Sequence, residues 1–154
     1  MPTIRVIADT SVSADGVLAA AHDFSERRAE VFPAVSVPRL TVHELGDTFA
    51  DVTEGTRAGL VVNWERCRYD WSRPGSVVAT VTDSNVYAIP GSSWEITAVP
   101  RNEGSQVEMV WIREFKRNGK GTVFGTLFRL GGKPIFGRYA RKVLKNIERL
   151  EAGA

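Results

Sequence analysis

The sequence predicts an α+β fold in which one antiparallel sheet is covered by a long C-terminal helix. Two observations lead to this class. From Arg39 to Lys116 the chain consists of short strand-like segments separated by turn residues, and from Pro134 to Glu151 apolar residues recur at helical spacing. A sheet with one apolar face must bury that face, and the C-terminal helix carries the longest apolar stripe available.

The chain begins with a strand and two short helices. Residues Thr3 to Ser11 alternate apolar and polar side chains, as a half-buried strand does. Ser13 offers an N-cap for a helix over 14–22. A second helical piece over 23–30 ends before Pro33, because the residue that precedes proline disfavours the helical conformation.

The middle of the chain predicts an antiparallel meander, so the sheet has about seven strands when the first is included. Turn residues separate the segments LTVHEL, FADVTEG, SVVATVT, SWEITAV and QVEMVWIREFK. Residues 122–130 fit two structures. The NGKG at 118–121 suits a hairpin that leads into a further strand, and it equally suits a helix start, since Phe124, Leu127 and Phe128 fall at helical spacing.

The C-terminal helix is strongly amphipathic, and Pro134 suits its first position. Its apolar face carries Phe136, Tyr139, Ala140, Val143, Leu144, Ile147 and Leu150. The opposite face is almost wholly cationic, with Arg138, Arg141, Lys142, Lys145 and Arg149 within about 100° of one another. An open sheet curled around one helix cannot pack flush along its whole length, so we expect a gap between them.

Composition bounds the class of protein. The 154 residues predict a single domain, over 1–154. The sequence has no apolar run of membrane-spanning length and no signal-peptide pattern, and Cys67 is its only cysteine, so we expect a cytoplasmic protein without disulfide, metal or cofactor. Residues 113–149 hold eleven basic and two acidic residues, a net charge of +9, so the remainder carries −7. This asymmetry fits either an anionic partner or a merely solvated basic helix.

The segment VNWERCRYDW, residues 62–71, has the length and residue types of a strand but alternates poorly. One face would carry Val62, Trp64, Arg66, Arg68 and Asp70, and the other Asn63, Glu65, Cys67, Tyr69 and Trp71. Each face mixes aromatic and charged side chains, which an ordinary half-buried strand has no reason to do. Such a mixture suits the wall of a partly apolar, partly wet cavity.

The order of elements and several stretches of sequence resemble the SRPBCC or START-like helix-grip superfamily, in particular its polyketide cyclase/dehydrase and lipid-transport branch. The opening PTIRVIADTSVSADGVLAAAHDFSERRAEVFP is similar to that family's first strand and paired short helices. VVNWERCRYDWSRPG resembles its long strand with a tryptophan, GSSWEITAVPRNEGSQVEMVW its last two strands, and FGRYARKVLKNIERLE its terminal helix. The resemblance covers nearly the whole chain.

The resemblance implies a seven-stranded antiparallel sheet that grips the C-terminal helix around an elongated, mostly apolar cavity. Members bind sterols, phospholipids, polyketides, quinones or plant hormones, and some cyclise or dehydrate aromatic polyketides. We therefore expect a binder of a hydrophobic or amphipathic small molecule, lipid-like or polyketide-like. The alternatives are a polyketide cyclase or dehydratase acting in the same cavity and a protein-interaction module. The branch has no fixed catalytic signature that can be transferred to this chain.

The strand over 60–71 supplies the first expected ligand-binding residues. By analogy with the family's tryptophan strand, Trp64, Arg66 and Arg68 point into the cavity, where guanidinium groups orient an anionic ligand. In the alternative, the stems of Arg66 and Arg68 cover Trp64 on the outer surface, and the wall is formed by Cys67, Tyr69 and Trp71. The other expected wall residues are Trp94, Trp111 and Tyr139.

Catalytic side chains are not evident in the sequence. The two imidazoles, His22 and His43, have no catalytic arrangement, and the motifs of metalloproteases, serine hydrolases and phosphate-binding loops are absent. The cationic helix face favours transient contact with an anionic membrane, through Arg138, Arg141, Lys142, Lys145 and Arg149. Nucleic-acid binding is disfavoured, because no exposed aromatics for base stacking interleave with the basic residues. No residue pattern specifies an oligomeric state.

Overall fold

A seven-stranded antiparallel sheet is the body of the computed structural model, which describes residues 2–58 and 60–153. Its strands are β1 (Thr3–Thr10), β2 (Thr41–Leu45), β3 (Phe49–Ala58), β4 (Val61–Asp70), β5 (Ser76–Ser84), β6 (Ser93–Pro100) and β7 (Ser105–Ile112). Their order is β1-β7-β6-β5-β4-β3-β2, so consecutive strands from β2 to β7 are neighbours and β1 joins the edge beside β7. The predicted antiparallel meander is confirmed.

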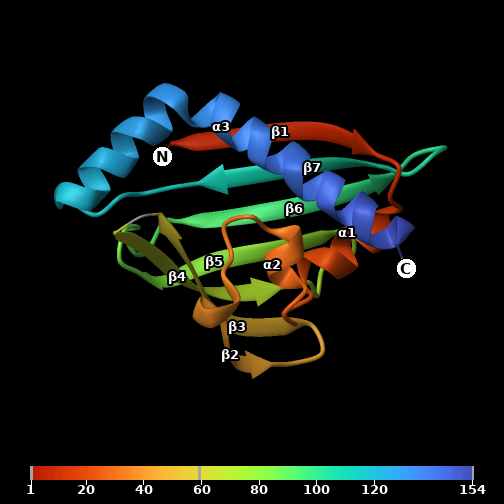
Figure 1. Cartoon of the computed structure of the whole chain (residues 1–154), viewed down its shortest axis with the longest axis horizontal. Helices are drawn as coiled ribbons and strands as arrows, with labels where there is room; N and C mark the ends of the chain where they lie inside the picture. Colours follow the sequence, from red (N-terminus) through yellow and green to blue (C-terminus); the bar gives the residue numbers. More distant parts are fainter. Residues whose placement is uncertain (1, 59, 154) are drawn as a thin grey trace.

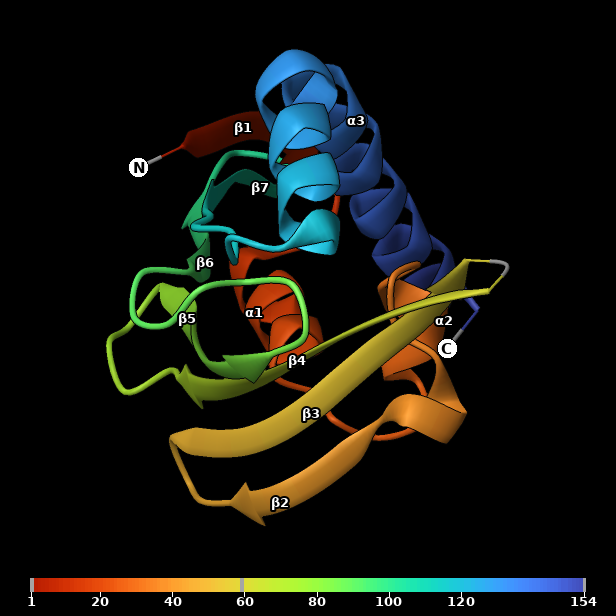
Figure 2. The ribbon, with the colours of Figure 1, turned by 90° about the vertical axis from the view of Figure 1, so that its left-hand side faces the viewer.

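Three helices and one 3₁₀ turn accompany the sheet within the described residues. These are α1 (Ala14–Ala21), α2 (Arg28–Val31), η1 (Val37–Arg39) and α3 (Gly119–Ala152). Figure 2 shows the sheet curving around α1 and α3, so its concave face meets the helices. Figure 1 shows α3 crossing that face, and its closest strand is β1. The α+β architecture predicted from the sequence, a sheet wrapped around the C-terminal helix, is confirmed.

The first two helices follow from local side-chain capping. The Ser13 hydroxyl accepts a hydrogen bond from the Gly16 amide at 3.1 Å, so Ser13 caps α1 as predicted. The second helix is shorter than the predicted 23–30. The Asp23 carboxylate accepts from the Ser25 amide at 2.9 Å, which favours a turn over a helix at this point. Only four residues, Arg28–Val31, are helical as a result.

The C-terminal helix starts much earlier than Pro134, so that prediction is wrong. Asn118 caps the helix by accepting a hydrogen bond from the Gly121 amide at 2.8 Å, and 122–130 are therefore helical. Pro134 lies inside the helix. Because proline has no amide hydrogen to donate to the carbonyl four residues earlier, it permits a bend. Figure 1 shows α3 changing direction about midway along its length.

The helix and the sheet share one core. On α3 the side chains of Ala140, Val143, Leu144 and Ile147 are buried, while Phe136, Tyr139 and Leu150 pack against the core, as the helical spacing predicted. On β4 the buried side chains are Cys67 and Tyr69. Since side chains alternate along a strand, Asn63 and Glu65 share this inner face, and Arg66 and Arg68 lie on the other.

Candidate functional site

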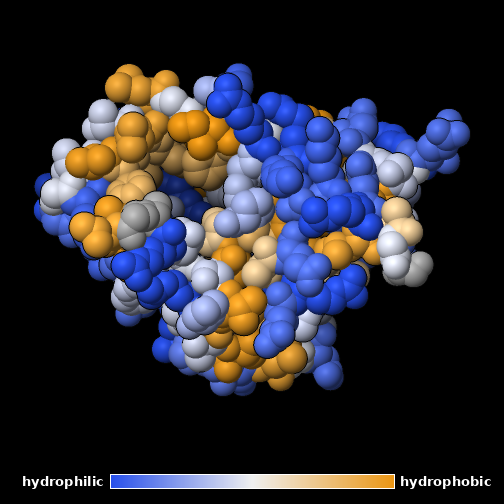
Figure 3. Space-filling model, viewed as in Figure 1, coloured by the Kyte–Doolittle hydropathy of each residue, from blue (hydrophilic) through white to orange (hydrophobic). Residues whose placement is uncertain are grey.

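A cavity of about 210 Å³ lies between the concave face of the sheet and α3. Its walls come from the segment after α2, from strands β3, β4, β6 and β7, and from the middle of α3. The lining residues are Arg28, Phe32, Ala34, Val35, Glu54, Gly55, Thr56, Asn63, Trp64, Glu65, Tyr87, Trp94, Ile96, Met109, Trp111, Arg113, Ile135, Phe136 and Tyr139. Figure 3 shows a hollow on this side of the molecule, with a mainly hydrophobic rim and a hydrophilic floor.

Aromatic side chains form one wall of the cavity. Trp94 on β6 and Trp111 on β7 are directly opposite one another in the sheet. The Trp111 ring meets Phe136 of α3 edge-on, with 4.8 Å between ring centroids, and Tyr139 one helical turn further on at 6.2 Å. Both tryptophans are largely buried. This wall offers flat apolar surface to a ligand.

Two carboxylates face one another on the floor of the cavity. Glu54 on β3 and Glu65 on β4 are direct cross-strand partners. Like charges at directly opposed positions are destabilising, and burial strengthens the repulsion. Each carboxylate is therefore expected to need a cation beside it, and each has one.

The first cation, Arg28 of α2, is fully buried and holds Glu54. Its Nε donates to one Glu54 oxygen, and the Tyr69 hydroxyl donates to the other at 2.9 Å. Its Nη2 donates to the Tyr69 hydroxyl at 3.1 Å, and its Nη1 donates to the Ala21 carbonyl at 3.0 Å. Burial, the largest single influence, would lower the pKa of Arg28, but the charges and hydrogen bonds of Glu54 and Tyr69 together outweigh it and raise the pKa. All three guanidinium nitrogens are thus engaged by the protein.

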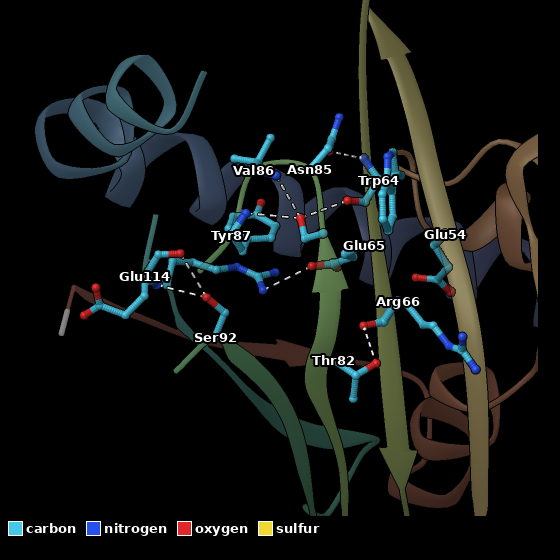
Figure 4. A network of polar contacts seen from close by, with 12 residues as sticks. Glu54, Trp64, Glu65, Arg66, Thr82, Asn85, Val86, Tyr87, Ser92 and Glu114 are labelled. Carbon is cyan, nitrogen blue, oxygen red and sulfur yellow. Dashed lines mark hydrogen bonds and ion pairs between the residues drawn. The ribbon is translucent and has the colours of Figure 1, made fainter. Parts of the chain in front are cut away.

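The second cation, Arg113, follows β7 and holds Glu65. Its Nη1 lies 3.3 Å from Glu65 Oε2, and its guanidinium group stacks on the Tyr87 ring at 4.4 Å from the centroid. Burial raises the pKa of Glu65 above its ordinary 4.5, and the nearby Glu54 adds to this, although Arg113 acts in the opposite direction. Figure 4 shows Glu65 pointing away from its chain neighbour Arg66, on the other side of β4.

A β-bulge and the Ser84 side chain hold the segment after β5, which carries Tyr87. The pairing of β4 with β5 shifts at Arg66 and Cys67, so that Thr82 is extra and Ser84 turns to the inner side. The Ser84 hydroxyl donates to the Trp64 carbonyl at 2.9 Å and accepts from the amides of Val86 and Tyr87 (Figure 4). The Tyr87 ring is thereby fixed against Arg113.

Four of the residues predicted to bind a ligand line the cavity: Trp64, Trp94, Trp111 and Tyr139. Whether they contact a ligand stays a prediction. The expected inward orientation of Trp64, Arg66 and Arg68 is wrong, because these three residues alternate with Asn63, Glu65 and Cys67 and leave β4 on the opposite face. Arg66 forms a two-pronged pair with Asp51 at 2.8 and 2.7 Å, and the Arg68 guanidinium lies over the Phe49 ring at 3.9 Å. Strand alternation places both on the outer side, because Cys67 and Tyr69 occupy the core.

The alternative wall of Cys67, Tyr69 and Trp71 does not form either. Cys67 and Tyr69 do face inward, but they belong to the packed core and to the Arg28 cluster. Trp71 stacks on His22, with ring centroids 4.6 Å apart. Among the lining residues that the sequence reasoning missed are three charged ones, Arg28, Glu54 and Arg113. Glu54 alone had a signal, which was alternation: Ala50, Val52 and Glu54 share a face of β3, which places a carboxylate in line with core residues.

Further features concern metals and membranes. Within residues 2–58 and 60–153, no group of three or more His, Cys, Asp or Glu side chains is arranged to hold a metal ion. None of the helices in this part of the chain combines the length and the apolar character that crossing a bilayer requires.

Comparison with known proteins identifies the fold. The chain is similar to TTHA0849 from Thermus thermophilus, with a TM-score of 0.75 and 15% identity over 99% of this chain and 100% of that one. It is similar to the Zhui aromatase/cyclase from Streptomyces sp. R1128, with a TM-score of 0.73 and 14% identity over 96% and 93%. It is also similar to a START superfamily protein from Mycobacterium smegmatis, with a TM-score of 0.73 and 10% identity over 96% of this chain and 98% of that one. No protein-family model and no curated protein matches the sequence.

At identities this low, the structural similarity establishes the fold and does not establish an activity. The seven-stranded sheet, its curvature around α3 and the likeness of these structures over almost the whole chain agree with one another. The chain therefore has the helix-grip fold of SRPBCC and START-like proteins.

Proposed function

We propose that this protein binds a small hydrophobic or amphipathic molecule in the cavity between the sheet and α3. The observation that carries the proposal is the cavity itself, with an aromatic wall at Trp94, Trp111 and Phe136 and a polar floor at Glu54 and Glu65. An engineered apolar cavity of roughly 150 Å³ takes up benzene. A cavity of about 210 Å³ is therefore suited to a ligand core of one or two fused rings.

Native mass spectrometry, followed by organic extraction, tests for a co-purifying molecule. Ala34 is exposed and lines the cavity, so Ala34→Trp should fill the entrance without disturbing the core. Ala152→Trp, at the exposed end of α3, is the matched control. The proposal predicts that uptake of 2-naphthol, measured by equilibrium dialysis, is lost in Ala34→Trp and retained in the control. Equal uptake by both variants would contradict it.

The outer face of α3 supports a route for loading the ligand from an anionic membrane. Exposed Val123, Leu127, Leu130 and Pro134 recur every three or four residues, and exposed Arg138, Arg141, Lys145 and Arg149 continue the same line. The apolar half of this line suits contact with the edge of the bilayer interior, and the cationic half suits contact with anionic headgroups. Lys142 lies beside this line.

Vesicle co-sedimentation tests the membrane contact. Each basic residue near an anionic surface contributes about 1 kcal/mol, so Lys145→Glu should weaken binding to phosphatidylserine vesicles by roughly 5- to 30-fold. Arg101→Glu, in the exposed β6–β7 loop, should leave binding nearly unchanged. If the protein bound neutral phosphatidylcholine vesicles as strongly as phosphatidylserine vesicles, an electrostatic contribution to membrane binding would be ruled out.

A second candidate function is catalysis on a polyketide-like substrate in the same cavity. Two features favour it: the pKa of Glu65 is raised, chiefly by burial, and Tyr139 lines the same cavity. The likeness to an aromatase/cyclase agrees with this direction. Incubation with a poly-β-keto thioester analogue, followed by ultraviolet absorbance of aromatic products, tests it. Turnover that persists in Glu65→Gln would exclude Glu65 as the acid or base.

A further inference from the structure

The charges on the floor of the cavity are already matched by the protein. Arg28 uses its guanidinium nitrogens on Glu54, Tyr69 and the Ala21 carbonyl. Arg113 pairs with Glu65 and covers Tyr87 with its flat face. Two positive and two negative side chains leave no net charge, so an incoming carboxylate would find the charge of each cation already balanced by a carboxylate, with both carboxylates nearby.

Two acceptor atoms on the floor, one on Glu65 and one on Asn63, have no hydrogen-bond partner among the described residues. Only one Glu65 oxygen, Oε2, has a hydrogen-bond partner among the described residues, and the side chain keeps 18% of its surface accessible. Asn63 Oδ1 is buried and has no partner in that same part of the chain. Asn63 and Glu65 are two residues apart on the inner face of β4, and both line the cavity. A buried acceptor without a donor is costly, and a ligand that supplies one removes the cost.

Two donors with spare capacity lie near these acceptors. Arg113 Nε is buried and has no partner among the described residues. Tyr139 lies across the cavity on α3, within electrostatic reach of both ion pairs, and no described group hydrogen-bonds to its hydroxyl. A hydroxyl on the ligand both donates and accepts, so it can satisfy an acceptor on β4 and accept from a donor of this kind.

We propose that the cavity selects a ring-bearing ligand whose polar end is a neutral hydroxyl, a phenol or an alcohol, and that Glu65 and Asn63 share the one hydrogen bond that this hydroxyl donates. This inference rests on the proposed binding function and names the ligand class for the same cavity. It replaces the anionic ligand expected from Arg66 and Arg68. A carboxylate of the same size is disfavoured, because it brings a third negative charge next to Glu54 and Glu65.

Three matched probes test the selectivity: 2-naphthol, 2-methoxynaphthalene and 2-naphthoate, each measured by equilibrium dialysis at neutral pH. They share the fused ring and differ in the polar group, which is respectively a neutral donor, an acceptor only and an anion. We expect 2-naphthol to bind at least about 10-fold more tightly than either of the others, the usual worth of a hydrogen bond to a charged group.

Glu65→Gln provides the second arm of the test. The substitution keeps the shape and removes one negative charge, which leaves Arg113 without its counter-ion. The order of affinities should then invert, with 2-naphthoate gaining and 2-naphthol losing. Glu95→Gln, on the outer face of β6 and paired with Arg73, is the control and should change neither affinity. Asn63→Leu, which removes the other acceptor, should weaken 2-naphthol alone and serves if Glu65→Gln does not fold.

The outcomes separate the two proposals. Equal affinity for all three probes, or tighter binding of 2-naphthoate by the wild type, overturns the ligand class and leaves the proposed binding function standing. An absence of binding for every probe overturns the binding function, and the ligand class with it.

Discussion

Replacing Arg28 by methionine should be among the most destabilising single changes in this protein. Methionine keeps an unbranched apolar stem between Phe24 and Phe32, whose rings each lie 4.5 Å from the guanidinium carbon. It leaves the Glu54 carboxylate without its cation, and it leaves the Ala21 carbonyl without the donor now at 3.0 Å. Breaking a buried ion pair by removing one partner costs about 3–5 kcal/mol.

The size of this effect can be read by thermal unfolding. For a chain of this length, 1 kcal/mol moves Tm by roughly 2–4 °C, so Arg28→Met should lower Tm by roughly 6–20 °C. Arg5→Ala, which removes an exposed ion pair with Glu108, is the control and should cost less than about 1 kcal/mol. The double variant Arg28→Met, Glu54→Leu should recover much of the loss, because no unpaired charge remains. If Arg28→Met lowers Tm no more than Arg5→Ala does, the reasoning about the buried ion pair is wrong.

Three further outcomes follow from the structure. Asn118→Ala removes the cap of α3 and should cost about 1 kcal/mol in urea unfolding, whereas Asn102→Ala in the exposed loop should cost little. Burial raises the pKa of the Cys67 thiol, so a disulfide reagent should label it slowly in the native state and fast in urea; fast native labelling would contradict this. Carboxyl NMR should show the Glu65 side chain titrating above 4.5. Because the pKa of Glu65 is then higher in the folded than in the unfolded state, the free energy of unfolding should fall as the pH rises from 4.5 through the folded-state pKa. Titration below 4.5 would show that Arg113 outweighs burial.

The fold was largely predictable because its signals are local. The two periodicities, two for strands and 3.6 for helices, are properties of the backbone and survive in any context. They gave the antiparallel meander and the buried face of α3, while the residue type of Ser13 gave the cap of α1. The start of α3 was missed because Pro134 suits the first position of a helix and residues 122–130 fitted a strand as well as a helix. In the structure the helix runs without interruption from Gly119 to Ala152, through the bend (Figure 1).

The cavity was only partly predictable. Trp94, Trp111 and Tyr139 were expected at its wall as large aromatic residues on the last two strands and on the C-terminal helix. Arg66 and Arg68 were misplaced because VNWERCRYDW offers two faces of similar polarity. What decides between them is that Tyr69 reaches Arg28 and Glu54, forty-one and fifteen residues away.

The sequence by itself therefore determined the order of the elements and the apolar face of each, since those depend on neighbours along the chain. The tertiary structure decided which strand face turns inward and which charges meet. Glu54 and Glu65 become opposed only when β3 and β4 pair, and their partners Arg28 and Arg113 arrive from α2 and from the end of β7. A buried charge is tolerated only beside a matching one. That matching is made across the fold, so no stretch of sequence displays it.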